Sequence, residues 1–142
     1  IIGSRDEINL TEGYDENATE PADHLIAEKY IAQGTKIVVI KHGKAGSIAY
    51  TADKKAYKVS SYNIKLLKSF GGGDAYGSAF VYGLLEGWSV ADSLQHGTAH
   101  AAMVVASHSC SNAMQTVEQI DAFMTEHKAE KVITEIAWEA AL

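Results

Sequence analysis

The sequence predicts an α/β protein with a mostly parallel sheet and flanking helices. Segments with strand and helix patterns alternate along the 142 residues, as they do in βαβ units. The apolar run at 37–40 is unbroken, which suits a parallel strand covered on both faces. No repeat, low-complexity tract or linker-like change of composition divides the chain. We therefore expect one domain, or part of one.

The first expected elements are a strand end and two helices. The apolar pair at positions 1 and 2 is typical of the end of a buried strand, and a short helix is expected over 4–10. A better helical pattern covers 21–33, where Pro21 lies in the first turn and Gly34 ends the helix.

Strands and helices then follow in order. The strand at 37–40 precedes a hairpin, whose arms at 47–51 and 56–60 are joined by a polar turn. The first helix after the hairpin, at 75–86, is apolar nearly all round, which predicts that it is buried. The remaining helices are expected over 90–107 and 117–127, the last with a capping box made by Thr116 and Gln119.

A run of three glycines precedes that apolar helix. Gly71, Gly72 and Gly73 permit unusual backbone angles and let N–H groups approach an anion closely. Asp74 follows, and a helix that begins near it adds the positive end of its dipole. Two interpretations fit these residue types equally: an anion site with a base at its edge, or an ordinary helix start with Asp74 as N-cap.

The longer run at 68–83, KSFGGGDAYGSAFVYG, resembles the G-A-G-D signature of the ribokinase-like (PfkB) carbohydrate kinases. Gly72 stands where the family usually has Ala, and Lys68-Ser69 where many members have Asp-Thr; the sugar-acid kinase branch tolerates the Lys-Ser start. The resemblance implies ATP-dependent phosphorylation of a sugar or sugar acid hydroxyl, with Mg²⁺. It makes Asp74 the general base, the glycines the donors to the transferred phosphoryl group, and Ser69 a nucleotide contact.

The segment Ser4-Arg5-Asp6-Glu7 has two interpretations. Its spacing alone favours a capping box, with Ser4 at the N-cap and Glu7 three residues on. Its place after a buried strand matches the N-x-x-E motif of the family, in which the Glu helps to order magnesium. Ser4 replaces the family Asn, so only Glu7 is carried over as a metal residue, and a single carboxylate acting through water suits Mg²⁺.

A glycine loop follows the strand at 37–40. The spacing of Gly43 and Gly46 is explained about as well by a plain strand-to-hairpin connection. The family has a similar loop lining the nucleotide phosphates, which implies that Lys41, Gly43 and Gly46 contact ATP. The segment 98–114 resembles the adenine-side segment of the family, with Thr98 where many members use Asn.

Two other patterns are set aside. His96 and His100 are four residues apart on an expected helix, but the Glu of the zinc-protease pattern and a third ligand are missing, so plain helix histidines are favoured. The glycines at 71, 73 and 77 do not form G-x-G-x-x-G, which argues against a Rossmann dinucleotide site.

The composition indicates which classes of partner and which cellular location to expect. A net charge of −6 and a pI near 5.4 argue against nucleic acid or an anionic membrane as partner and favour small molecules. The family resemblance implies that these are ATP and a sugar acid. The single cysteine, Cys110, excludes an internal disulfide and suits a cytoplasmic location. No signal segment and no apolar run of about 20 residues is present.

Length sets the last expectation. Ribokinase-like enzymes are roughly twice as long, so residues 1–142 are expected to be the C-terminal nucleotide-binding and catalytic part, with the N-terminal sugar-binding and lid part absent. A sheet cut in this way exposes an edge, which predicts a homo-oligomer. Two alternatives stay open: a non-catalytic nucleotide-binding or assembly fragment, and a kinase of another sugar or a nucleoside.

Overall fold

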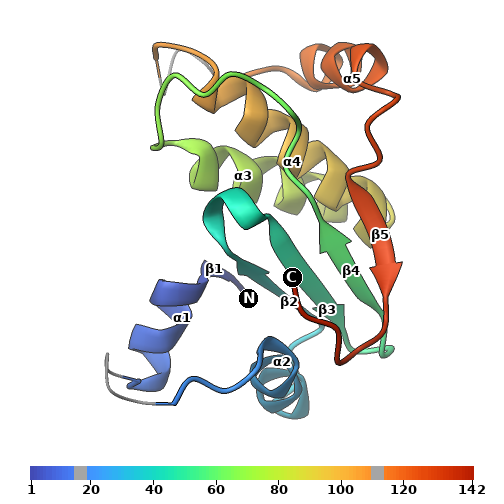
Figure 1. Ribbon diagram of the computed structural model, residues 1–142. Helices are drawn as coiled ribbons and strands as arrows, with labels where there is room; N and C mark the ends of the chain where they lie inside the picture. The colour runs from blue at the N-terminus through green and yellow to red at the C-terminus, as the bar shows by residue number, and fades with distance from the viewer. Residues whose placement is uncertain (15–18, 110–113) are drawn as a thin grey trace. The chain divides into compact units, whose positions relative to one another are not determined.

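The computed structural model describes residues 1–14, 19–109 and 114–142 (Figure 1). These residues form two compact units, each described by itself: unit 1 comprises Ile1–Val59 and Thr134–Leu142, and unit 2 comprises Ser60–Ile133. Cys110 and the rest of 110–113 lie outside the described residues.

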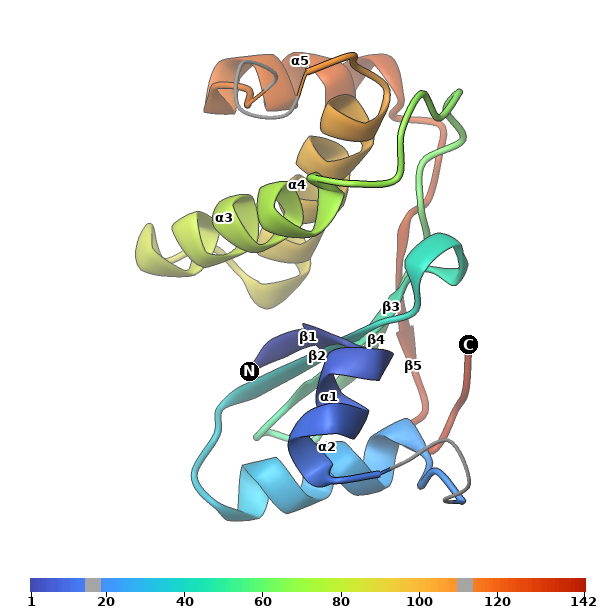
Figure 2. The same ribbon diagram turned by 90° about the vertical axis from the view of Figure 1, so that its left-hand side faces the viewer.

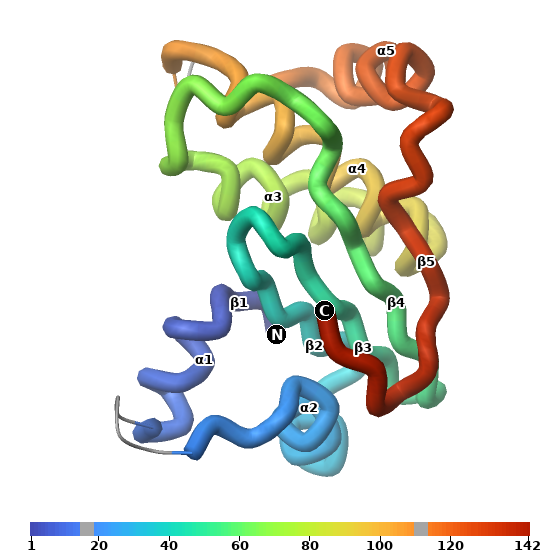
Figure 3. The backbone as a smooth tube through the Cα atoms, in the orientation of Figure 1, coloured from blue at the N-terminus to red at the C-terminus, as the bar shows by residue number. Residues whose placement is uncertain are grey.

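Unit 1 contains a five-stranded sheet in the order β1-β2-β3-β4-β5, which is the order of its strands along the chain. Figure 3 shows β4 and β5 lying side by side. The strands are β1 (Ile2–Ser4), β2 (Ile37–Lys41), β3 (Ser47–Thr51), β4 (Ala56–Val59) and β5 (Ile133–Ile136), the last of which starts one residue before unit 1 resumes.

The sheet is mixed rather than mostly parallel. β1 pairs with β2 in parallel, whereas β2–β3 and β3–β4 are antiparallel. The connections at 42–46 and 52–55 explain this, because so few residues can join antiparallel neighbours but cannot form a parallel crossover. The register of the parallel pair sets Ser4 beside Lys41. The chain therefore leaves β1 and β2 at the same, carboxyl edge of the sheet.

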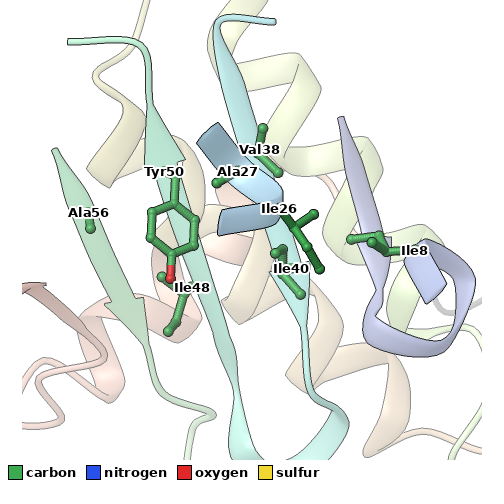
Figure 4. Close-up of a cluster of buried hydrophobic side chains, with 8 residues drawn as sticks. All are labelled: Ile8, Ile26, Ala27, Val38, Ile40, Ile48, Tyr50 and Ala56. Carbon is green, nitrogen blue, oxygen red and sulfur yellow. The ribbon is translucent and has the colours of Figure 1, made fainter. Parts of the chain in front are cut away.

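Two helices, α1 (Arg5–Glu12) and α2 (Asp23–Ala32), lie on one face of this sheet (Figure 2). Their apolar side chains and those of the strands form the core of unit 1, shown in Figure 4. The members are Ile8, Ile26, Ala27, Val38, Ile40, Ile48, Tyr50 and Ala56.

Unit 2 is built on the close packing of α3 (Gly72–Leu85) against α4 (Val90–Val105). A Cβ on Gly97 would lie 2.9 Å from the backbone oxygen of Tyr76, so glycine permits this approach. α5 (Val117–Glu126) packs against α4, and Tyr62 meets Phe123 edge to face at 5.1 Å.

Most expected elements are present, but α2 and α3 differ in detail and two further elements are found. Pro21 lies before α2, whose N-cap is Ala22, because the chain is still extended there. α3 begins at Gly72 rather than near Asp74, and it is not buried all round, since Leu85 is 80% exposed. β5 and a short 3₁₀ turn, η1 (Gly43–Ala45), were not predicted.

Candidate functional site

The glycine turn of unit 2 sets the start of α3. Gly71 is the N-cap and adopts the left-handed conformation (φ 84°), which favours glycine. The next three residues are already helical, so the N–H groups of residues 71–74 are the ones that have no partner within the helix. One of the two interpretations of the glycine run has these N–H groups bind an anion.

Asp74 lies in the first turn of α3 and is exposed. Gly71 occupies the capping position at the start of α3, and no side chain among the described residues makes a cap hydrogen bond there. Asp74 as N-cap, one of the two interpretations left open by the sequence, is therefore wrong. Asp74 thus belongs to the first turn, which is the positive end of the helix dipole.

The C-terminal end of α4 holds the glycine turn in place. The backbone oxygen of Val105 accepts from the N–H groups of Leu67 (3.0 Å) and Lys68 (3.3 Å). The Lys68 ammonium donates to the Ser109 oxygen. Ser69, the predicted nucleotide contact, lies in the exposed stretch between these anchors and Gly71.

Gly72 is fixed by packing. A Cβ at this position would lie 2.8 Å from Cγ1 of Val105, a distance that real side chains do not tolerate. The Val105 side chain thus occupies the space that an alanine would need at position 72. This explains why glycine stands where the G-A-G-D signature has alanine.

Glu7, the predicted metal residue, takes part in a capping box in unit 1. Its Oε2 accepts from the Ser4 N–H (2.6 Å), and the Ser4 hydroxyl accepts from the Glu7 N–H (3.2 Å). These hydrogen bonds, together with the charge of Lys41, lower the pKa of Glu7. The register Ser4–Lys41 thus brings two predicted site residues together at the carboxyl edge of β1 and β2, where parallel strands place ligands.

The loop after β2 needs both of its glycines. Gly43 (φ 57°) and Gly46 (φ 101°) have backbone angles that other residues rarely adopt. The loop is closed by the His42 N–H, which donates to the Gly46 oxygen at 2.8 Å. Within the part of the chain that the structure describes, the N–H groups of Gly43 and Lys44 donate no backbone hydrogen bond.

The predicted adenine-side segment, 98–114, begins on α4 with Thr98. Thr98 is 7% exposed, and its hydroxyl has no hydrogen-bond partner among the described residues. The later part of the same segment includes 110–113, which lie outside the described residues.

The two helix histidines bind separate protein groups. His96 Nε2 contacts Asp121 (2.7 Å), and His100 Nε2 accepts from the Gln115 N–H (3.0 Å). Among the residues that the structure describes, no group of three or more His, Cys, Asp or Glu side chains is arranged to hold a metal ion.

Sequence reasoning missed one set of polar residues in unit 1. Asp23 lies between Arg5 (2.8 Å) and His42 (2.6 Å). These residues come from α1, the start of α2 and the loop after β2. The only local signal was an acidic residue in the first turn of a helix, which the helix dipole alone explains.

Comparisons with solved structures show the class of fold. Ribokinase from Thermotoga maritima has a TM-score of 0.74 and 25% identity, covering 87% of this chain and 41% of that one. Arabidopsis thaliana ribokinase, solved with ribose and ATP, has a TM-score of 0.74 and 21% identity, covering 87% and 39%. The fold is thus ribokinase-like.

The chain belongs to the pfkB family of carbohydrate kinases, whose family model matches residues 1–117. A 5-dehydro-2-deoxygluconokinase of Clostridium tetani is 58% identical over 130 residues, which cover 92% of this chain and 38% of that protein. One of Geobacillus kaustophilus is 41% identical over 128 residues, covering 90% and 38%. The chain thus spans about two fifths of the length of these curated relatives. None of its described helices has the length and apolar character needed to cross a membrane.

Proposed function

We propose that this chain is the nucleotide-binding and phosphoryl-transfer part of an ATP-dependent sugar-acid kinase. The substrate that we propose is 5-dehydro-2-deoxy-D-gluconate, phosphorylated on its terminal hydroxyl in inositol catabolism, because the curated relatives at 54–58% identity carry that enzyme name. The observation that carries the proposal is the start of α3, where Gly71 is the N-cap and the exposed Asp74 lies in the first turn, among the residues whose N–H groups have no partner within the helix.

Unit 2 supplies the reacting groups. Transfer of the γ-phosphoryl group builds up charge on its oxygens, which fixed donors stabilise. The N–H groups of residues 71–74 serve as those donors. Asp74 accepts the proton of the attacking hydroxyl, and because an aspartate is a far weaker base than an alkoxide, the proton moves late, as the oxygen bonds to phosphorus.

Unit 1 supplies the metal and nucleotide contacts. Glu7 fits Mg²⁺ because capping engages one carboxylate oxygen and leaves an exposed negative charge, and Mg²⁺ accepts one or two carboxylates with retained waters. When bound, the ion neutralises phosphate charge. A structure described as a ribokinase II from E. coli, with a TM-score of 0.76 and 22% identity, was solved with ATP and Mg²⁺. Lys41, Gly43 and Gly46 are the proposed phosphate contacts, and Ser69 and Thr98 of unit 2 the further nucleotide contacts.

The test uses two samples: the 142-residue chain, and a chimera in which the first part of the Clostridium tetani relative precedes this chain. We expect sugar-dependent release of ADP from the chimera and no useful rate from the chain alone, because positioning of the hydroxyl contributes about 7 kcal/mol or more. Asp74→Asn should lower kcat of the chimera by about a hundredfold or more and leave ATP affinity unchanged. Near-normal turnover in Asp74→Asn would remove this residue from its role. A chimera that binds ATP and transfers nothing would favour the non-catalytic alternative.

A further inference from the structure

We propose that Asp23 and His42 are positioning residues that hold the glycine loop at 42–46 in the shape that receives the nucleotide phosphates. This inference rests on the proposed function, in which Gly43 and Gly46 contact ATP. It assigns a role to a side-chain cluster that lies outside the glycine and carboxylate motifs of the sequence.

The cluster is a chain of hydrogen bonds through one carboxylate. Asp23 Oδ1 accepts from Arg5 Nη1 at 2.8 Å, and Asp23 Oδ2 faces His42 Nε2 at 2.6 Å. Because a carboxylate only accepts, the Nε2 of His42 carries the proton in this contact. Both oxygens of Asp23 are therefore occupied by donors from two other elements.

Arg5 is held by further contacts. Its Nη2 donates to the Pro21 oxygen (2.7 Å) and its Nε to Glu20 (3.3 Å). The side chains of Arg5, Asp23 and His42 are only 12%, 15% and 26% exposed, so water competes weakly for these hydrogen bonds. The cluster is thus a fixed connection, unlike an exposed ion pair.

The central carboxylate lies at the start of a helix. Asp23 is the first residue of α2, where the positive end of the helix dipole stabilises an anion. The buried Tyr50 lies close enough for the charge of Asp23 to add to the effect of burial in raising the pKa of its hydroxyl. The residue that joins Arg5 and His42 thus lies at the N-terminus of α2 and close to a core residue of unit 1.

The loop needs such a connection. Gly43 and Gly46 supply the necessary backbone angles, but glycines also lose the most conformational entropy when a single shape is fixed. His42 is the residue that closes the loop through its N–H and also contacts Asp23 through its ring. Asp23 thereby fixes the loop relative to α1, the helix that carries Glu7.

Three variants separate positioning from simple packing. Asp23→Asn keeps the size of the side chain but turns one of two acceptors into a donor, which then faces Arg5 or His42. His42→Gln keeps a donor near the position of Nε2, and His42→Leu removes it. The control is His127→Gln, because His127 makes a contact of the same 2.6 Å length with Glu130 in unit 2.

Two measurements are made on the 142-residue chain. Amide hydrogen exchange of His42, without nucleotide, reports how firmly the loop is closed. Titration with Mg²⁺-ATP, followed by NMR of the Gly43 and Gly46 amides, reports affinity. We expect Asp23→Asn and His42→Leu to exchange about tenfold faster and to bind Mg²⁺-ATP about tenfold more weakly, since a hydrogen bond to a charged group contributes about that factor. His42→Gln and His127→Gln should resemble the wild type.

The outcomes are distinct. Unchanged exchange and affinity in Asp23→Asn and His42→Leu would overturn the positioning role. The same would follow if His127→Gln weakened ATP binding as much, because the effect would then be general destabilisation. Faster exchange in a chain whose Gly43 and Gly46 signals do not respond to Mg²⁺-ATP would leave the loop connection standing and refute the nucleotide contacts of the proposed function.

Discussion

Replacing Gly72 by alanine tests whether the turn before α3 is shaped by packing against α4. The new Cβ would lie 2.8 Å from Cγ1 of Val105, whereas carbon atoms in favourable contact lie about 3.5–4.0 Å apart, so a shift of about 1 Å is required. The backbone of Val105 cannot move freely, because its oxygen accepts from Leu67 and Lys68. Overpacking of this kind costs about 1–3 kcal/mol. We expect Gly72→Ala to lower the free energy of unfolding by about 1–2 kcal/mol after a small gain in helix propensity.

Gly77 on the same helix is the matched control. Nothing lies within 4 Å of a Cβ built on it, so Gly77→Ala should raise the free energy of unfolding by about 0.5–1 kcal/mol through helix propensity alone. Val105→Ala removes the clashing methyl group. The double variant Gly72→Ala/Val105→Ala should therefore be more stable than the sum of the two single changes predicts, by about 1 kcal/mol or more.

Urea unfolding followed by circular dichroism measures all four variants. The reasoning is refuted if Gly72→Ala is as stable as Gly77→Ala. It is refuted equally if the two changes at positions 72 and 105 add to within about 0.5 kcal/mol, since residues in contact should not be independent.

Three further predictions concern charge and surface. Burial lowers the pKa of His100, so the contribution of this residue to stability is present above the unfolded value of about 6.5 and is lost as the pH falls toward the lowered pKa. Between pH 7.5 and 5.5, the free energy of unfolding of His100→Gln should therefore fall less than that of the wild type. An equal fall in both proteins would contradict this prediction. Glu7→Gln keeps an acceptor for the Ser4 N–H but loses the charge. The urea midpoint of this variant should therefore be below that of the wild type at neutral pH, and the two midpoints should match once the pH is below the lowered pKa of Glu7. A difference that stays constant with pH would count against this prediction. Val81 and Leu85 are 46% and 80% exposed on α3, so light scattering of the 142-residue chain should show association that Leu85→Lys reduces, and a monomer at all concentrations would exclude it.

The sequence predicts well the parts of this fold that local rules determine. The bounds of β3 were predicted correctly, because its apolar residues lie between a glycine loop and a polar turn. The capping boxes before α1 and α5 are also present as the spacing indicates. β5 could not be found in this way: its four residues carry only a weak pattern, and their position in the sheet depends on β4, which is more than seventy residues earlier.

The candidate site likewise has residues that a local motif identifies and residues that only the fold brings together. The glycines and Asp74 form a continuous motif, so their types and order revealed them. The contacts of Asp23 did not, because Arg5, Asp23 and His42 are separated by about eighteen residues at each step and meet only through the packing of α1, α2 and the loop. No local sequence pattern predicts such contacts between distant residues.

Capping and ligand binding exclude each other at one of the two carboxylates, Asp74, but not at the other, Glu7. At Asp74 they compete, because a helix has one N-cap, and Gly71 fills it in a conformation that favours glycine. At Glu7 they do not, because capping engages one oxygen of the carboxylate and leaves its charge in place beside Lys41. The capping box therefore fixes the orientation of Glu7 in advance, which in the proposed metal role would reduce the entropy cost of binding an ion. For a carboxylate at the N-terminus of a helix, capping is thus evidence against a ligand role only where both carboxylate oxygens are engaged by the cap.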